Sequence, residues 1–154
     1  MRGRELLRKI GSPGPETAAA SVPEKPGAFG SVDELLEAGR QMFLARRRAG
    51  EARESLARGQ RDDDEQARVT GGLEHAARAW TSYFHRSFTA TGDAIHLCAR
   101  CRAKRLNRLE REILVGTILF HLSLLEVRGR LDCCDMLRML QVPGTRTVEA
   151  MRLM

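Results

Sequence analysis

The sequence predicts an all-α fold, a helical bundle that follows a disordered N-terminal tail. Beyond residue 30, apolar residues recur at the three- and four-residue spacing that places them on one face of a helix. Helix-capping residues stand at Ser31 and at Asn107. No strand pattern is evident. We therefore expect a single helical domain over residues 31–154, with upstream helices at 31–106 and a second helical unit at 107–154.

Composition limits the class of protein. The chain has 154 residues, of which 42% are hydrophobic, enough for one domain with a modest core and a tail. Its 26 Lys and Arg outnumber its 20 Asp and Glu, which gives a net charge of +6. This excess permits binding to nucleic acid or to an acidic partner without requiring it. Nearly all the cations are Arg, a bias that a GC-rich genome alone would produce.

No targeting or membrane segment is visible in the sequence. The first residues lack the sustained apolar run of a secretory signal. The most apolar stretch begins at Ile113, but Thr117, His121 and Ser123 interrupt it before it reaches the roughly 18–20 apolar residues of a membrane span. We therefore expect a cytoplasmic protein with reduced thiols and no membrane partner.

Residues 1–30 are predicted to be a disordered tail or tether. Most of this stretch is rich in Pro, Gly, Ala and Ser and has almost nothing to bury. Its first residues form a short basic amphipathic patch, which is more simply a frayed terminus than a docking peptide. The patch consists of Arg2, Arg4, Leu6, Leu7, Arg8, Lys9 and Ile10.

A first helix is predicted from residue 31 to about residue 56. Ser31 is a suitable N-cap, and Glu34 stands at the third helical position. The apolar face consists of Val32, Leu35, Leu36, Met42 and Phe43. The opposite face mixes charges of both signs, which favours a solvated surface with pairs such as Arg47 and Glu51. Its charged residues are Arg46, Arg47, Arg48, Glu51, Arg53 and Glu54.

A second helix is predicted from about residue 64 to about residue 89, with a possible interruption at Gly71-Gly72. An aromatic stripe at helical spacing is far more often core than cofactor site, so we assign it to the core. The stripe consists of Leu73, Ala76, Ala77, Trp80, Phe84 and Phe88. Thr91-Gly92-Asp93 should end this helix, and Asp93 is placed to cap the next one. Residues 94–106 then form a short basic segment.

The most apolar segment, residues 107–127, is predicted to be one central helix. Asn107 and Glu110 have the spacing of a capping box. Apolar residues occupy two nearly opposite sectors of this helix, separated by narrow polar stripes, one of which includes Glu112. A helix with two apolar faces should be covered on both sides. His121, within it, is interpreted as a buried structural histidine.

Two further helices are predicted at about 133–140 and 146–154, separated by a turn at Val142-Pro143-Gly144. With the central helix they have the order of a helix-turn-helix or truncated winged-helix core. We favour a unit that packs or binds protein. The alternative is DNA binding through the basic segment and the last helix, by Arg100, Arg102, Lys104, Arg105 and Arg146.

Candidate sites for chemistry are few. Cys98 and Cys101 form a CxxC motif that His96 extends, but the adjacent Cys133 and Cys134 do not have the spacing of a second zinc knuckle. Free thiols, with Cys98 and Cys133 as small core residues, are the preferred interpretation, and a metal site is the lesser alternative. The four histidines have no acid at dyad spacing, and no nucleophile or phosphate-loop motif occurs. We expect neither catalysis nor a cofactor.

Residues 70–154 resemble the helical, winged-helix-like region that precedes the ATPase core in some bacterial AAA+ ATPases. The resemblance rests on the leucine-rich helix at Leu106, Leu109, Glu110, Arg111 and Leu114. Downstream it rests on Met136, Leu137, Leu140, Gly144, Val148, Ala150 and Met151. The chain lacks the GxxxxGK[ST] loop of that family, so no functional residue carries over and ATP binding is not expected. The resemblance implies a regulatory or adaptor module, either a truncated relative or a gene fragment.

The expected function is therefore that of a non-catalytic regulatory or protein-interaction module. The sequence ends within the last predicted helix, without a C-cap residue, which suggests a truncated form of a longer protein. Such a truncation would expose the apolar face of Val148, Met151 and Met154, so we expect self-association or a protein partner.

Overall fold

The structure, a computed structural model, describes residues 21–59, 63–122 and 125. These residues form four helices: α1 (Val32–Ala57), α2 (Asp63–Thr91), α3 (His96–Ala103) and α4 (Arg108–His121). No strand occurs among them, which confirms the predicted all-α bundle. The predicted helices at 133–140 and 146–154, and with them the winged-helix details, lie outside the described residues.

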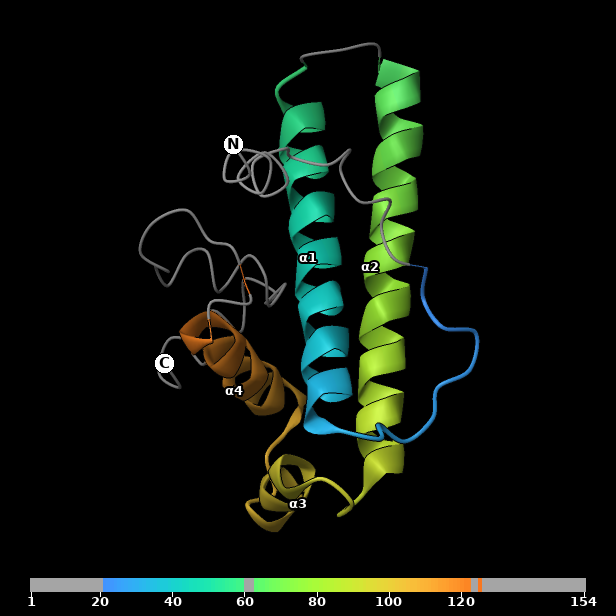
Figure 1. The fold of residues 1–154 in the computed structure, drawn as a ribbon. Coiled ribbons are helices and arrows are strands. Elements are labelled where there is room, and N and C mark those ends of the chain that lie inside the picture. The colour runs from blue at the N-terminus through green and yellow to red at the C-terminus, as the bar shows by residue number, and fades with distance from the viewer. Residues whose placement is uncertain (1–20, 60–62, 123–124, 126–154) are drawn as a thin grey trace, which may run out of the picture.

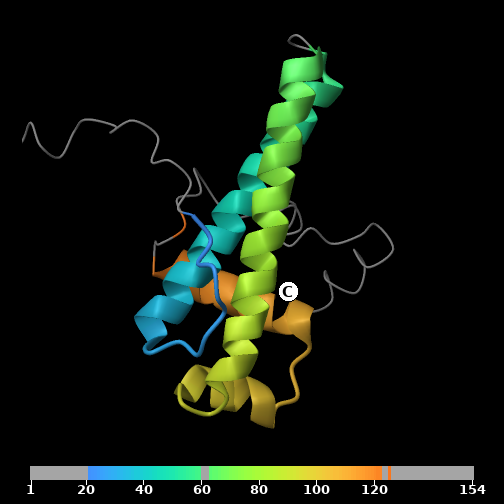
Figure 2. The same cartoon turned by 90° about the vertical axis from the view of Figure 1, so that its right-hand side faces the viewer.

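The two long helices, α1 and α2, lie side by side in opposite directions and form a hairpin (Figure 1). The short helix α3 lies at the end of the hairpin where α1 begins and α2 ends. Figure 2 shows α4 running across the hairpin near the same end. Within the described part of the chain, none of the helices combines the length and the apolar character needed to cross a bilayer.

Side-chain caps fix the starts of α1 and α4, as predicted. Ser31 Oγ accepts a hydrogen bond from the backbone N–H of Glu34 at 3.2 Å. At α4 the capping box is complete, since Asn107 Oδ1 accepts from the N–H of Glu110 at 3.0 Å and Glu110 Oε2 accepts from the N–H of Asn107 at 2.6 Å. These bonds satisfy backbone donors that the first helical turn leaves without partners.

The core lies between the hairpin and α4. The aromatic stripe predicted on α2 is part of it, because Trp80, Phe84 and Phe88 are all buried. From α1 it takes Leu35, Leu36, Met42 and Phe43, and from α3 and α4 it takes Cys98, Cys101, Val115 and Leu119. The predicted Arg47–Glu51 pair is also present, on the exposed face of α1 at 2.9 Å.

The segment before α1 contributes to the core, which was not predicted. Phe29 is 5% exposed and packs edge-on against Tyr83. Its backbone N–H donates to Thr91 Oγ1 at 2.9 Å, which ties the segment to the end of α2. Residues 21–30 were assigned to the tail because of their composition, but one large aromatic side chain is enough to anchor a short segment.

Three details of the helices differ from the predictions. The predicted interruption at Gly71 and Gly72 does not occur: α2 runs through both glycines as one long helix, which packs against α1. Asp93 does not cap α3, whose N-cap is Ile95, and instead pairs with Arg102 at 3.5 Å. α4 ends at His121, six residues before the predicted end, and His121 is exposed. The buried structural role assigned to His121 is therefore wrong.

A glycine allows α4 to pack closely against α1. A Cβ atom built at Gly39 would lie 2.7 Å from Val115 Cγ1 and 3.5 Å from Phe84 Cε2. Val115 is completely buried and cannot turn towards solvent. The close approach of the two helices therefore requires glycine at this position.

We predict that Gly39→Ala destabilises the protein by about 1–2 kcal/mol, because overpacking outweighs the gain in helix propensity of about 1 kcal/mol. The matched control is Gly50→Ala on the same helix, where an added Cβ meets nothing within 4 Å. The control should be neutral or stabilising by up to about 1 kcal/mol. Urea unfolding of both variants measures the difference. Equal effects of the two substitutions would show that no close contact exists at Gly39.

Candidate functional site

A network of charged side chains lies inside the protein and joins three helices. Arg46 on α1 binds Glu112 on α4 through two hydrogen bonds, Nη1 to Oε2 at 2.7 Å and Nη2 to Oε1 at 2.9 Å. His85 on α2 binds the same carboxylate, with 2.6 Å between Nε2 and Oε1. Arg46 Nε also donates to Thr81 Oγ1 on α2 at 3.1 Å. We call Arg46, Thr81, His85 and Glu112 the buried network.

The three charged or titratable side chains of the network are almost fully removed from water. Arg46 is 4% exposed, Glu112 5% and His85 7%. Burial alone would raise the pKa of Glu112, but the hydrogen bonds from His85 and Arg46, with the attraction of the Arg46 charge, hold the pKa below its ordinary value of 4.5. Glu112 therefore stays ionised as the counter-ion of Arg46.

The sequence interpretation missed this network. Arg46 was assigned to a solvated face and Glu112 to a polar stripe, and both are buried. Helical phase would have indicated the error for Arg46, because Gly39, Met42 and Phe43 are buried on the same side of α1. The histidines were judged to have no acid partner because only spacing along the chain was considered.

A groove beside the network is lined by cations. Its lining residues are Arg78, Thr81, Ser82, His85 and Arg86 of α2 and Arg108 of α4, and its volume is about 340 Å³. No acid of the described residues lines it. We call it the basic groove. It shares Thr81 and His85 with the buried network, so it lies where α4 begins its passage over α2.

A second groove lies on another face of the hairpin, between the segment before α1 and the two long helices. Its volume is about 510 Å³. Its aromatic residues are Phe29, Trp80 and Tyr83, and the rings of Trp80 and Tyr83 meet edge to face with centroids 5.7 Å apart. Three acids of α1 also line it, namely Asp33, Glu34 and Glu37. We call this the aromatic groove.

The basic residues predicted to bind DNA are partly placed by the structure. Arg100, Arg102, Lys104 and Arg105 are exposed on α3 and just after it. Arg102 pairs with Asp93, and Arg105 adopts a left-handed backbone conformation with φ of 55°. Arg146 lies outside the described residues, as do Val148, Met151 and Met154 of the predicted interaction surface.

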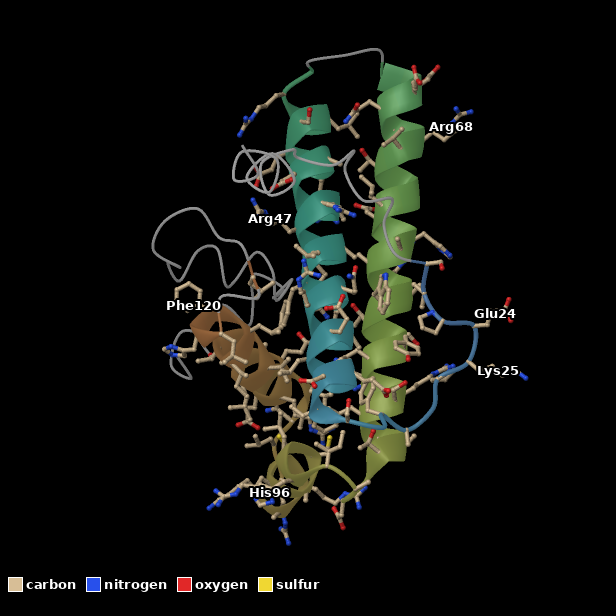
Figure 3. The ribbon with its side chains drawn as sticks, in the orientation of Figure 1. Glu24, Lys25, Arg47, Arg68, His96 and Phe120 are labelled. Carbon is tan, nitrogen blue, oxygen red and sulfur yellow. The ribbon has the colours of Figure 1, made fainter. Side chains whose placement is uncertain are left out.

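The two cysteines of the CxxC motif face inwards, whereas His96 is exposed on α3 (Figure 3). Burial raises the pKa of Cys98 to about 11, and the neighbouring Cys101 thiol adds to the increase. The positive charges of Arg111 and Arg102 lower the pKa, but by less. Burial likewise raises the pKa of Cys101. A thiol of raised pKa is protonated at neutral pH and is a poor ligand and nucleophile. Cys98 is a core residue, as predicted.

The described residues bring no three His, Cys, Asp or Glu side chains together in a way that could hold a metal ion. Cys133 and Cys134, the other cysteines considered for such a site, are not among them.

Comparisons of the chain with protein-family models, with curated proteins and with solved structures found no match. The resemblance to the region before the ATPase core of AAA+ ATPases therefore stays a prediction.

We predict that Glu112→Gln destabilises the protein by about 2–4 kcal/mol at pH 7, because it leaves the buried Arg46 without a counter-ion. Glu112 has a lower pKa in the folded than in the unfolded state, so its contribution is complete above pH 4.5 and is lost as pH falls through the folded value. The difference between wild type and variant should shrink below pH 4.5. Urea unfolding at pH 7, 5 and 3.5 measures it.

The control is Glu51→Gln, which removes an acid from the exposed pair with Arg47. It should change the free energy of unfolding by less than about 0.5 kcal/mol. A destabilisation by Glu112→Gln that is as small as that of the control, or that does not depend on pH, would contradict the assignment.

Proposed function

We propose that this protein is a non-catalytic interaction module whose aromatic groove binds a peptide segment of a protein partner. The observation that carries the proposal is the composition of the groove, which joins three aromatic side chains to three acids and one Lys, Lys25. The segment best suited to it carries apolar and basic side chains together. The proposal retains the cytoplasmic location inferred from the sequence.

The aromatic residues supply the apolar part of the proposed contact. Trp80 and Phe29 are buried, so they form a floor, and Tyr83 is partly exposed beside them. Aromatic side chains contribute large contact areas at low entropic cost and are enriched at protein interfaces. A smaller pocket of about 140 Å³ shares Trp80 and Gln41 with the groove and continues it along the hairpin.

The acids supply the selectivity. Asp33, Glu34 and Glu37 follow one face of the first turns of α1. Glu34 accepts a hydrogen bond from the backbone of Gly30, and Glu37 bonds with Arg40 and Gln41, so these two are held in place. One cation, Lys25, also lines the groove, so three acids against one Lys give the lining a net negative charge on a chain of net charge +6, which favours a basic partner over an acidic one.

A second candidate is nucleic-acid binding by α3. The observation that favours it is the group of exposed cations Arg100, Lys104 and Arg105 at one end of the molecule. Arg105 keeps a left-handed conformation in which glycine would be less strained, and a side chain retained in such a position can have a functional reason. This candidate does not use the aromatic groove.

The test is a selection of random 12-residue peptides on the full-length protein, followed by affinity measurements. We expect enrichment of peptides that combine Arg or Lys with Leu or aromatic residues. The emission of Trp80, the single tryptophan, should change on binding, because this ring lines the groove. Asp33→Asn with Glu37→Gln should weaken binding about fivefold, as rim charges contribute modestly.

The matched control is Glu51→Gln, an acid of α1 outside the groove, which should leave peptide affinity unchanged. Peptides that bind equally to wild type and to the Asp33/Glu37 double variant would rule out the groove as the docking site. Absence of enriched peptides, with salt-sensitive binding of random duplex DNA that Arg100→Gln with Lys104→Gln abolishes, would favour the second candidate.

A further inference from the structure

We propose that the basic groove is a binding site for a phosphate group. The groove lies apart from the aromatic groove and shares no lining residue with it. The proposal is therefore independent of the peptide-binding function. It rests on two features of the lining: three cations that pair with no acid of the described residues, and an exposed hydroxyl group.

The first feature is the set of three cations. Arg78, Arg86 and Arg108 are exposed, and none of them pairs with an acid among the described residues. They approach one space from two helices, Arg78 and Arg86 from α2 and Arg108 from the first turn of α4. Guanidinium groups recognise phosphate oxygens through paired hydrogen bonds, and several of them around one space stabilise a doubly charged anion.

The acids nearest to these arginines in the sequence are already engaged. Glu74, one turn before Arg78, binds Arg53 at 2.7 Å. Glu110 is bound to the backbone of Asn107 in the capping box, and Glu112 is neutralised by Arg46 in the buried network. Glu110 keeps its own charge, but neither it nor any other acid of the described residues lines the groove, so the lining has a net positive charge.

The second feature is a free hydroxyl group. Ser82 lines the groove and is exposed, and a hydroxyl donates readily to a phosphate oxygen. The hydroxyl of Thr81, also in the lining, already donates to the carbonyl oxygen of Ala77 at 2.8 Å.

The size of the groove also fits the proposed ligand. At about 340 Å³ the groove has room for a phosphate ion or for a phosphate group of a larger molecule.

The experiment is a calorimetric titration of the full-length protein with inorganic phosphate, in a phosphate-free buffer at constant ionic strength. We expect saturable binding at one site. Arg86→Gln with Arg108→Gln should weaken it at least about tenfold, because each substitution removes charge-assisted hydrogen bonds. Both side chains are exposed, so the double variant should keep its fold, which its unfolding curve checks.

The matched control removes two cations from α3 by Arg100→Gln with Lys104→Gln, neither of which lines the groove. It should leave phosphate affinity within about twofold, because screened charges at a distance contribute little. Equal losses in the two double variants would show a diffuse positive field and overturn the proposal. The absence of saturable binding at phosphate concentrations up to about 20 mM, a range that would reveal even a Kd of about 1 mM, would also overturn the proposal.

A competition arm identifies the source of the phosphate group. A ten-residue single-stranded oligonucleotide that displaces inorganic phosphate from wild type, and does so less well from the Arg86/Arg108 double variant, would support the site and assign it to a nucleic-acid backbone. Retention of bound phosphate in the presence of the oligonucleotide would support the site and assign it to a small phosphate-bearing ligand.

Discussion

The ion pair between Arg46 and Glu112 is the constraint on which the rest of this structure depends. It is buried at 4% and 5% exposure, and its bonds are short and bidentate. Removing two charges from water costs several kcal/mol for each ion, and their attraction offsets that cost only when hydrogen bonds satisfy the remaining atoms. His85 and Thr81 meet that condition here. Through Glu112, the network therefore joins α4 to both α1 and α2, the two helices of the hairpin.

The position of α4 in turn decides what lies at the surface. Gly39 lets α4 approach α1, and the network fixes its rotation, so that Val115 and Leu119 face the core. The same placement brings Arg108 over α2, where it completes the basic groove with Arg78 and Arg86. The aromatic groove does not depend on α4, because it is formed by the hairpin and the segment before it. The same helical hairpin therefore carries two grooves of opposite net charge, the basic groove and the aromatic groove.

Helix starts and the aromatic core could be predicted from the sequence because both are local signals. The caps at Ser31 and Asn107 act over three residues, and the stripe of Trp80, Phe84 and Phe88 repeats at helical spacing. The network and the two grooves could not be predicted in the same way. Arg46 and Glu112 are 66 residues apart, so although helical phase places Arg46 on the buried side of α1, no local signal indicates its partner. Only the pairing of helices brings such groups together.

A double-mutant cycle on Arg46→Met and Glu112→Leu tests most directly whether the ion pair determines the placement of α4. Each single variant buries one charge without its partner and should lose about 3–5 kcal/mol, whereas the double variant removes both charges and should lose less than either single variant. The coupling free energy should exceed about 2 kcal/mol. Additive losses, to within about 0.5 kcal/mol, would contradict the account, because they would mean that the two side chains do not meet in the folded protein.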